Sequence, residues 1–282
     1  MSLSFPEPDD NKAARACNRY RCQIVENRLE RQCGMIPASI LFSLGIGAAV
    51  IVTSLISGVF GMAGGLVLML ILGTVLPVQS AMVLHGATQF ISNGWRAGLW
   101  RQWIDWGIVG RYCVGAAPAI AIPLVLAFVP SKAFMLILLG ATPYLALAIP
   151  KEMALDAAKP AHAYACGFVV AGTQLLAGVA GPLLDTFFVR SAMDRRAVVA
   201  TKAATQAISH TLKIGYYGAL MHQVQALGWD VYAAAGAAAV IGTTLAAPVL
   251  EKMSNANFRK WTQTILLIVG AISVAQGVWL LM

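Results

Sequence analysis

The sequence predicts an all-α polytopic membrane protein built from two homologous, inverted five-helix repeats with broken helices. Of its 282 residues, 59% are hydrophobic and only 11% are charged, and the mean hydropathy is +0.72. A water-facing surface cannot be built from such a composition. Five apolar runs approach the roughly 20 residues with which a helix crosses a bilayer, namely 36–60, 107–128, 132–149, 229–250 and 261–282. Related motifs also recur in the same order in both halves of the chain.

Helices follow from what lipid demands of the backbone. Every buried backbone polar group needs a partner within the protein, so only helices and closed barrels cross a bilayer. The uninterrupted apolar runs lack the alternating pattern of barrel strands. We expect segments in the first half near 36–59, 65–76, 80–99, 107–128 and 132–149. In the second half we expect 161–180, 183–192, 196–218, 229–250 and 258–281.

The duplication rests on two pairs of motifs. Gly-Val-Phe-Gly at 58–61 returns as Gly-Val-Ala-Gly at 178–181, and residues 87–93 return at 204–210 as Ala-Thr-Gln-Ala-Ile-Ser-His. We therefore expect a polar tail at 1–35, one transmembrane repeat at 36–150 and a second at 151–282. The tail lacks the pattern of a secretory signal. In each repeat glycine or proline interrupts the helix just before a segment that is too short to span the membrane. The helix break is therefore expected within the membrane.

The distribution of lysine and arginine predicts the orientation. The loops near 95–111, 150–160, 190–196 and 251–260 are basic, and the alternate loops carry at most one such residue. Ten crossings with both ends of the membrane part outside place every basic loop in the cytoplasm. A re-entrant first short helix is the alternative. The net charge of +8 is thus explained by loops and tail, and nucleic-acid binding is not expected.

The third helix of each half carries a polar stripe at helical spacing. The first stripe comprises His85, Thr88, Gln89, Ser92, Asn93 and Arg96, and the second comprises Lys202, Thr205, Gln206, Ser209, His210 and Lys213. Polar faces are costly against lipid, so both stripes should face the bundle interior or a watery cavity. Their basic content favours an anion. The alternative is that they serve only to hold helices together.

Depth separates the members of the two stripes. Lys202, Lys213 and Arg96 lie near helix ends and have the option of snorkelling to the interface. The remaining polar side chains, with the glycines of the first break, are the predicted substrate-binding residues: Gly61, Gly64, Gly65, Thr88, Gln89, Ser92, Asn93, Thr205, Gln206, Ser209 and His210. The glycines qualify because a helix that restarts in the membrane offers unpaired N–H groups to an anion. Close helix packing is the alternative reading of these glycines.

A coupling or charge role is predicted for Asp185, His85 and Lys202. Asp185 is expected to open the short helix of the second half, where it either stabilises the helix N-terminus or carries a coupling proton. The sequence has no CxxC pair and no Cys/His ligand spacing. No metal site, cofactor or catalytic residue is therefore predicted.

The residues that carry these motifs resemble a known family. Gly58-Val-Phe-Gly-Met-Ala-Gly-Gly65 at the end of a first helix, followed by the Ala-Thr-Gln segment, is similar to the sulfite exporter TauE/SafE family over about residues 40–280. The resemblance implies a permease of the bacterial inner membrane for sulfite or sulfur-containing organic anions. The second half departs from the family's glycine-rich pattern, with Gly181-Pro-Leu-Leu-Asp185.

The sequence therefore predicts a membrane transporter of small anions. Coupling to protons and assembly into a homo-oligomer are compatible with this prediction. A scaffold or assembly factor is the alternative. A membrane-embedded enzyme has less support, because no nucleophile–base pair shares a helix face.

Overall fold

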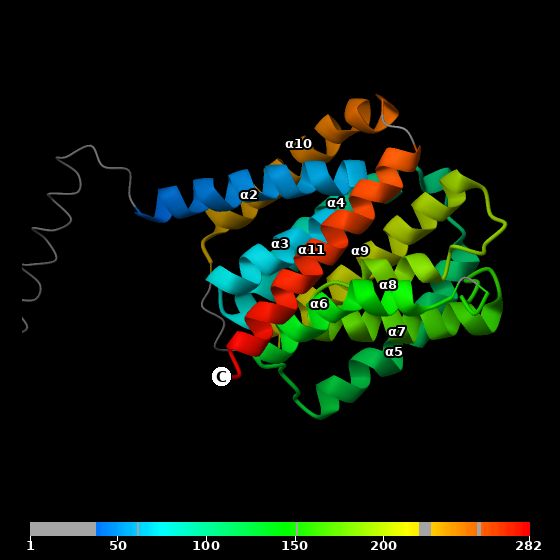
Figure 1. Ribbon diagram of the computed structural model, residues 1–282, viewed down its shortest axis with the longest axis horizontal. Coiled ribbons are helices and arrows are strands. Elements are labelled where there is room, and N and C mark those ends of the chain that lie inside the picture. The colour runs from blue at the N-terminus through cyan, green and yellow to red at the C-terminus, as the bar shows by residue number, and fades with distance from the viewer. Residues whose placement is uncertain (1–37, 61, 151, 220–226, 253–254) are drawn as a thin grey trace, which may run out of the picture. The chain divides into compact units, whose positions relative to one another are not determined.

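The structure is a computed structural model, and it describes residues 38–282 except 61, 151, 220–226 and 253–254. In these residues the chain forms ten α-helices, one short 3-10 helix and no strand. The α-helices are labelled in Figure 1. The helices of the first half are α2 (Ala38–Phe60), α3 (Ala63–Val75), α4 (Val78–Leu99), η1 (Arg101–Trp103), α5 (Trp106–Val125) and α6 (Lys132–Ala148). Those of the second half are α7 (Pro160–Ala177), α8 (Gly181–Thr186), α9 (Arg195–Ala219), α10 (Trp229–Lys252) and α11 (Asn255–Trp279).

The predicted all-α class is confirmed, and each expected segment corresponds to one helix. Boundaries agree closely for most helices because local signals set them. Asp105 and Ser131 accept backbone N–H bonds at the starts of α5 and α6, as N-cap residues do. Pro160 and Pro182 occupy first-turn positions in α7 and α8, where a missing N–H costs nothing.

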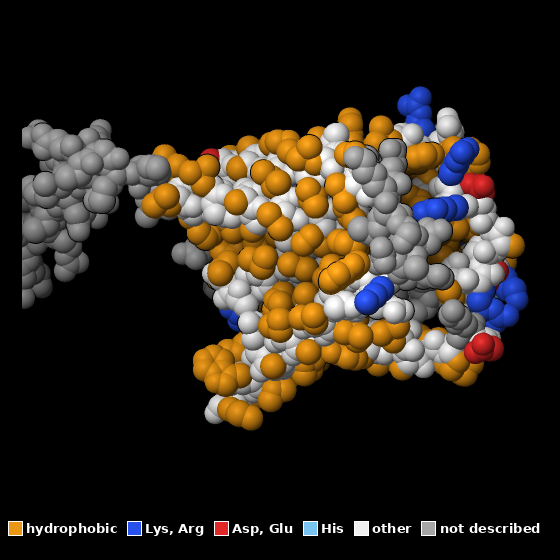
Figure 2. Space-filling model, turned by 45° about the horizontal axis from the view of Figure 1, so that its top comes forward, with side chains coloured by type: hydrophobic (Ala, Val, Ile, Leu, Met, Phe, Trp, Pro, Cys, Tyr) orange, Lys and Arg blue, Asp and Glu red, His pale blue; other side chains and the backbone are white. Residues whose placement is uncertain are grey.

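Several helices have the character of membrane spans. Ile40–Phe60, Trp106–Val125 and Lys260–Trp279 are long and apolar enough to cross a bilayer, and Ala63–Val75 and Lys132–Ala148 are shorter apolar helices. Large hydrophobic side chains such as Val114, Leu145 and Ile268 are exposed. Figure 2 shows apolar side chains over most of one face, with lysine and arginine gathered mainly at one end. Such a surface is typical of a protein that lies in lipid.

Helices α4 and α9, α5 and α7, and α6 and α11 pack in pairs, and glycine permits the closest approaches. A Cβ atom on Gly115 would meet the Tyr164 carbonyl, and one on Gly167 would meet the Tyr112 carbonyl, so α5 and α7 touch backbone to backbone. Gly140 of α6 lies equally close to the Gly270 carbonyl of α11. Lipid provides no hydrophobic force between helices, and close packing through small residues replaces it.

Contacts between connections define two ends of the helix bundle. At the basic end, Arg190 donates to the Glu152 carbonyl at 2.6 Å, and the Arg196 guanidinium lies 5.1 Å from the centre of the Trp103 ring. At the opposite end, Lys132 donates to the Thr74 carbonyl at 2.9 Å. The basic connections near 100–105, 152–159 and 187–194 therefore meet at one end.

Helices α7 and α8 form a hairpin that returns to the basic end. The Ala157 N–H, just before α7, donates to the Phe187 carbonyl, just after α8, at 2.8 Å. Helix α8 has six residues and rises about 9 Å. The expected bounds of 183–192 are therefore wrong, because the helix covers Gly181–Thr186. Residues past Thr186 continue as turns, and the Phe187 carbonyl accepts the Ala157 N–H instead of extending the helix.

Helices α2 and α3 also fold back on each other. A Cβ atom on Gly64, in the first turn of α3, would meet the Thr53 carbonyl and the Ser57 backbone nitrogen of α2. The far end of α3 lies at the opposite end of the bundle, where Lys132 binds its last carbonyls. The two hairpins thus end at different ends of the bundle.

Candidate functional site

The two polar stripes meet in the interior, because α4 and α9 pack along each other. His85, Thr88, Gln89, Ser92 and Asn93 of α4 are buried. So are Thr205, Gln206, Ser209, His210 and Lys213 of α9. The predicted inward orientation of both stripes is confirmed. The rings of His85 and His210 approach to 5.5 Å between centres.

The turns of the two hairpins meet beside the stripes. A Cβ atom on Gly181, at the start of α8, would contact the Met62 side chain just before α3. Gly178 ends α7 with φ of 84°, a left-handed conformation that glycine adopts without strain. The hairpin turns face interior positions of α4 and α9, since Gly65 contacts Gln89 and Gly178 bonds Lys213. Both helix breaks, which are the turns of the two hairpins, therefore lie inside the bundle.

A chain of hydrogen bonds joins the two breaks through both stripes. The Lys213 Nζ donates to the Gly178 carbonyl at 2.9 Å and lies 2.9 Å from His85 Nδ1. A lysine ammonium has donors only, so Nδ1 accepts and the proton of His85 is on Nε2. That nitrogen then donates to the Gly65 carbonyl at 2.9 Å. The side chains of Lys213 and His85 thus link α3, α4, α7 and α9.

A small polar cavity lies between the stripes and the hairpin turns. Its lining residues come from all of these elements: Ser57, Met62, Gly65, His85, Gln89, Asn93, Arg96, Val179, Gly181, Gln206 and His210. The volume is about 20 Å³, which is room for about one water molecule. None of these lining residues is Asp or Glu, so the charged groups that face the cavity are basic.

Three nitrogens at the cavity are buried and have no hydrogen-bond partner among the described residues: Arg96 Nη2, Gln206 Nε2 and His210 Nδ1. Unpaired buried polar atoms cost stability and are uncommon in native structures. Asn93, by contrast, donates to the carbonyl and the side-chain oxygen of Gln89 at 2.9 and 3.3 Å. The unpartnered nitrogens thus come from both helices, Arg96 from α4 and Gln206 and His210 from α9.

Other predicted substrate residues lie outside the cavity. The Ser92 hydroxyl bonds Thr243 of α10 at 3.0 Å, and the Ser209 hydroxyl bonds Tyr112 of α5 at 2.5 Å. Thr88 and Thr205 donate to carbonyls of their own helices. Their hydroxyls therefore act between helices or along one helix, as the alternative reading of the stripes described.

The predicted glycines have different positions. Gly65 lines the cavity and accepts the His85 bond. Gly64 packs α3 against α2, in agreement with the packing alternative. Gly61 lies outside the described residues.

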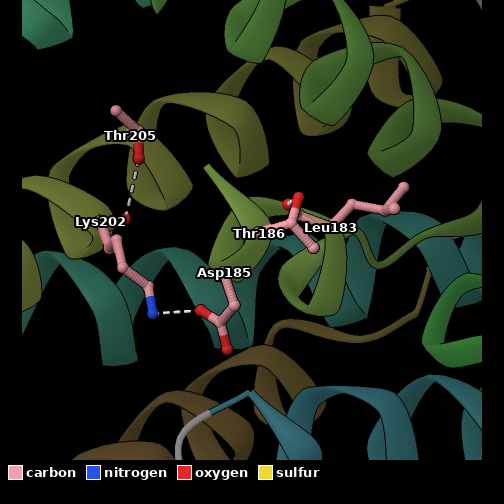
Figure 3. A network of polar contacts seen from close by, with 5 residues as sticks. All are labelled: Leu183, Asp185, Thr186, Lys202 and Thr205. Atoms are coloured by element: carbon pink, nitrogen blue, oxygen red, sulfur yellow. Dashed lines mark hydrogen bonds and ion pairs between the residues drawn. The ribbon is translucent and has the colours of Figure 1, made fainter. Parts of the chain in front are cut away.

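Asp185 and Lys202 form an ion pair between α8 and α9, shown in Figure 3. The side chains are 49% and 21% exposed, and neither lines the cavity. The expectation that Asp185 opens α8 is wrong, because the helix begins at Gly181 and Asp185 lies near its last residue, Thr186. In the same view Thr186 donates to the Leu183 carbonyl, and Thr205 to that of Lys202.

Sequence reasoning placed Arg96 and Lys213 at helix ends and left them out of the binding residues. Lys213 is only 1% exposed, and Arg96 lines the cavity. Their recurrence at matching stripe positions was the available signal. Among the described residues, no group of three or more His, Cys, Asp or Glu side chains is arranged to hold a metal ion.

Comparison with known proteins gives one family. The family model described as sulfite exporter TauE/SafE matches residues 46–272, a range that contains both stripes and both hairpin turns. No curated protein matches the chain, and no solved structure matches it.

Proposed function

Because the chain belongs to the sulfite exporter TauE/SafE family, we propose that it carries sulfite or a sulfur-containing organic anion across the bacterial inner membrane. The family is one of membrane transporters for sulfur-related anions and not of enzymes. The apolar helices agree with a multi-pass membrane protein. The particular solute, the coupling to protons and the type of membrane are parts of this proposal.

One observation supports the proposal most directly: the cavity between the two stripes is bordered by basic side chains and by the turns of both hairpins. Groups of this kind inside a membrane protein mark the path of a solute. A sulfur oxyanion is larger than the one water molecule for which the cavity has room. In this proposal the hairpins move away from α4 and α9 before the anion enters.

The hairpins and helix pairs support an inverted repeat. In the first half α2 packs on α10 through Gly58 and Gly242, and in the second half α7 packs on α5 through Gly167 and Gly115. The two contacts are equivalent under the repeat, because α2 of the first half corresponds to α7 of the second, and α5 of the first half corresponds to α10 of the second. Hairpin α2–α3 ends at the opposite end and α7–α8 at the basic end, as expected of two halves inserted in opposite directions.

We place the basic end in the cytoplasm, where lysine and arginine accumulate in membrane proteins. Both hairpins are then re-entrant: α2–α3 enters from the outer side and α7–α8 from the cytoplasmic side. The remaining helices α4, α5, α6, α9, α10 and α11 cross the membrane. Alternating movement of the two hairpins would open the cavity to one side at a time.

Proton coupling through Asp185 is a further part of the proposal. A neutral Asp185 would no longer attract the Lys202 ammonium, and α8 would lose its ion pair with α9. Because α8 belongs to the cytoplasmic hairpin, protonation would favour opening on that side.

Counterflow in proteoliposomes tests the proposed function. Vesicles loaded with sulfite, thiosulfate, sulfoacetate or a carboxylate of similar size should accumulate labelled solute only where the protein accepts that solute. Gln89→Ala and Gln206→Ala should each reduce flux without preventing membrane insertion. Gln102→Ala is the matched control, because Gln102 is exposed in η1. Wild-type flux equal to that of protein-free vesicles for every anion would contradict the proposal.

A further inference from the structure

The two stripes end in cations that occupy equivalent positions. Arg96 on α4 and Lys213 on α9 are 117 residues apart, the same offset that relates Gln89 to Gln206 and Asn93 to His210. A symmetric site would use both cations in the same way. The structure gives them different surroundings.

The Lys213 side chain is bonded to other groups of the protein. Its ammonium binds the Gly178 carbonyl and His85, it is almost fully buried, and it does not line the cavity. The carbonyl that it binds ends α7, where a helix leaves acceptors unpaired. Lys213 thus pairs with the carbonyl end of α7 and, through His85, links the turns of the two hairpins.

The Nη2 atom of Arg96 makes no such bond to the described residues. This nitrogen is buried and has no hydrogen-bond partner among the described residues, and Arg96 is one of the residues that line the cavity. Gln206 and His210, which are 5% and 3% exposed, present the two other unpartnered nitrogens of the same cavity. Arginine and amide nitrogens only donate, and an imidazole nitrogen donates when protonated. A ligand that satisfies these atoms must therefore supply hydrogen-bond acceptors.

We propose that Arg96, assisted by Gln206 and His210, is the residue that binds the anion and selects oxyanions, whereas Lys213 positions the framework. This inference rests on the proposed transport of anions and assigns its binding group. A guanidinium offers two parallel N–H donors that match two oxygens of one oxyanion, a geometry that a lysine ammonium does not reproduce. Arg96 should therefore determine selectivity as well as affinity.

A single water molecule could also occupy the cavity and bond the same three nitrogens. A water would leave Arg96 without an influence on anion selectivity. Binding measured with a defined anion distinguishes the two cases.

The experiment uses the purified full-length protein and sulfite as the probe. Ligand-dependent increases in unfolding temperature give the half-saturating sulfite concentration for the wild type, Arg96→Gln, Arg96→Lys and the control Arg101→Gln. Arg101 is exposed in η1. Arg96→Gln should raise that concentration at least tenfold. Arg96→Lys should retain binding but lose most of the preference for sulfite over acetate, and Arg101→Gln should match the wild type.

Gln206→Met provides a second test if Arg96→Gln does not fold. The Gln206 Nε2 makes no bond within the described protein, so its removal should leave the unfolding temperature without sulfite unchanged and weaken sulfite binding severalfold. Wild-type affinity and selectivity in the Arg96 variants, or in Gln206→Met where those do not fold, would overturn the inference while leaving transport intact. A wild-type protein without any response to anions, in binding and in counterflow, would overturn the proposed function as well.

Discussion

The bond between His85 and Lys213 allows a quantitative test of the buried polar chain. We consider His85→Leu and Lys213→Met, alone and together. Each single variant also loses a second bond, to Gly65 or to Gly178. Those losses appear again in the double variant, so they cancel in a double-mutant cycle and leave the energy of the pair.

The expected coupling follows from the geometry. The two nitrogens lie 2.9 Å apart and are buried. Interhelical hydrogen bonds in membrane proteins contribute about 0.6 kcal/mol on average and up to about 1.7 kcal/mol. Bonds to a charged group contribute about 1.5–3 kcal/mol. The pair should therefore be coupled by about 1.5 kcal/mol, where the two ranges overlap.

Reversible unfolding in mixed detergent micelles gives the four free energies of the cycle. A parallel cycle with His85→Leu and Lys260→Met is the control, because Lys260 is exposed on α11. The control cycle should be additive to within about 0.5 kcal/mol. Coupling of His85 and Lys213 below that same limit would refute the hydrogen-bonded chain as described.

The remaining predictions concern the hairpin, the cavity and the ion pair. Gly178→Ala should lower the unfolding free energy by at least about 1–2 kcal/mol, the cost of a left-handed alanine, because its Cβ atom would also meet the Met69 side chain. Gly110→Ala, on an open face of α5, should not lower it, and equal effects would contradict the special role of Gly178. Gln206→Met should leave stability unchanged or raise it, because it removes an unpaired buried nitrogen, while counterflow falls; a loss of stability would reveal a bond that the structure lacks. Asp185→Asn should change stability by less than about 1 kcal/mol, because the pair is partly exposed, and should abolish the pH dependence of flux in vesicles. An unchanged pH profile would exclude Asp185 from coupling.

The sequence predicted the stripes correctly because helical spacing alone decides which side chains share a face. The meeting of the stripes followed from the cost of polar groups against lipid, and α4 and α9 do pack face to face. The substrate roles of individual stripe residues remain predictions. Ser92 and Ser209 illustrate the limit, since their partners Thr243 and Tyr112 lie on other helices and no local pattern announces them.

The errors arose where tertiary contacts override local character. The apolar stretch at 183–192 reads as a longer helix, but the Ala157–Phe187 bond ends α8 early. Lys213 reads as a snorkelling residue because it lies near a helix end. Its depth is set instead by the Gly178 carbonyl, which belongs to a hairpin 35 residues earlier in the chain.

The central claim is that an anion occupies the interior space between α4 and α9. An experimental structure determined with saturating sulfite measures this most directly. We expect sulfite density in contact with Arg96, Gln206 and His210, with at least one hairpin displaced from its position here. Sulfite density only outside this space, with both hairpins still packed against α4 and α9, would contradict anion binding between these helices.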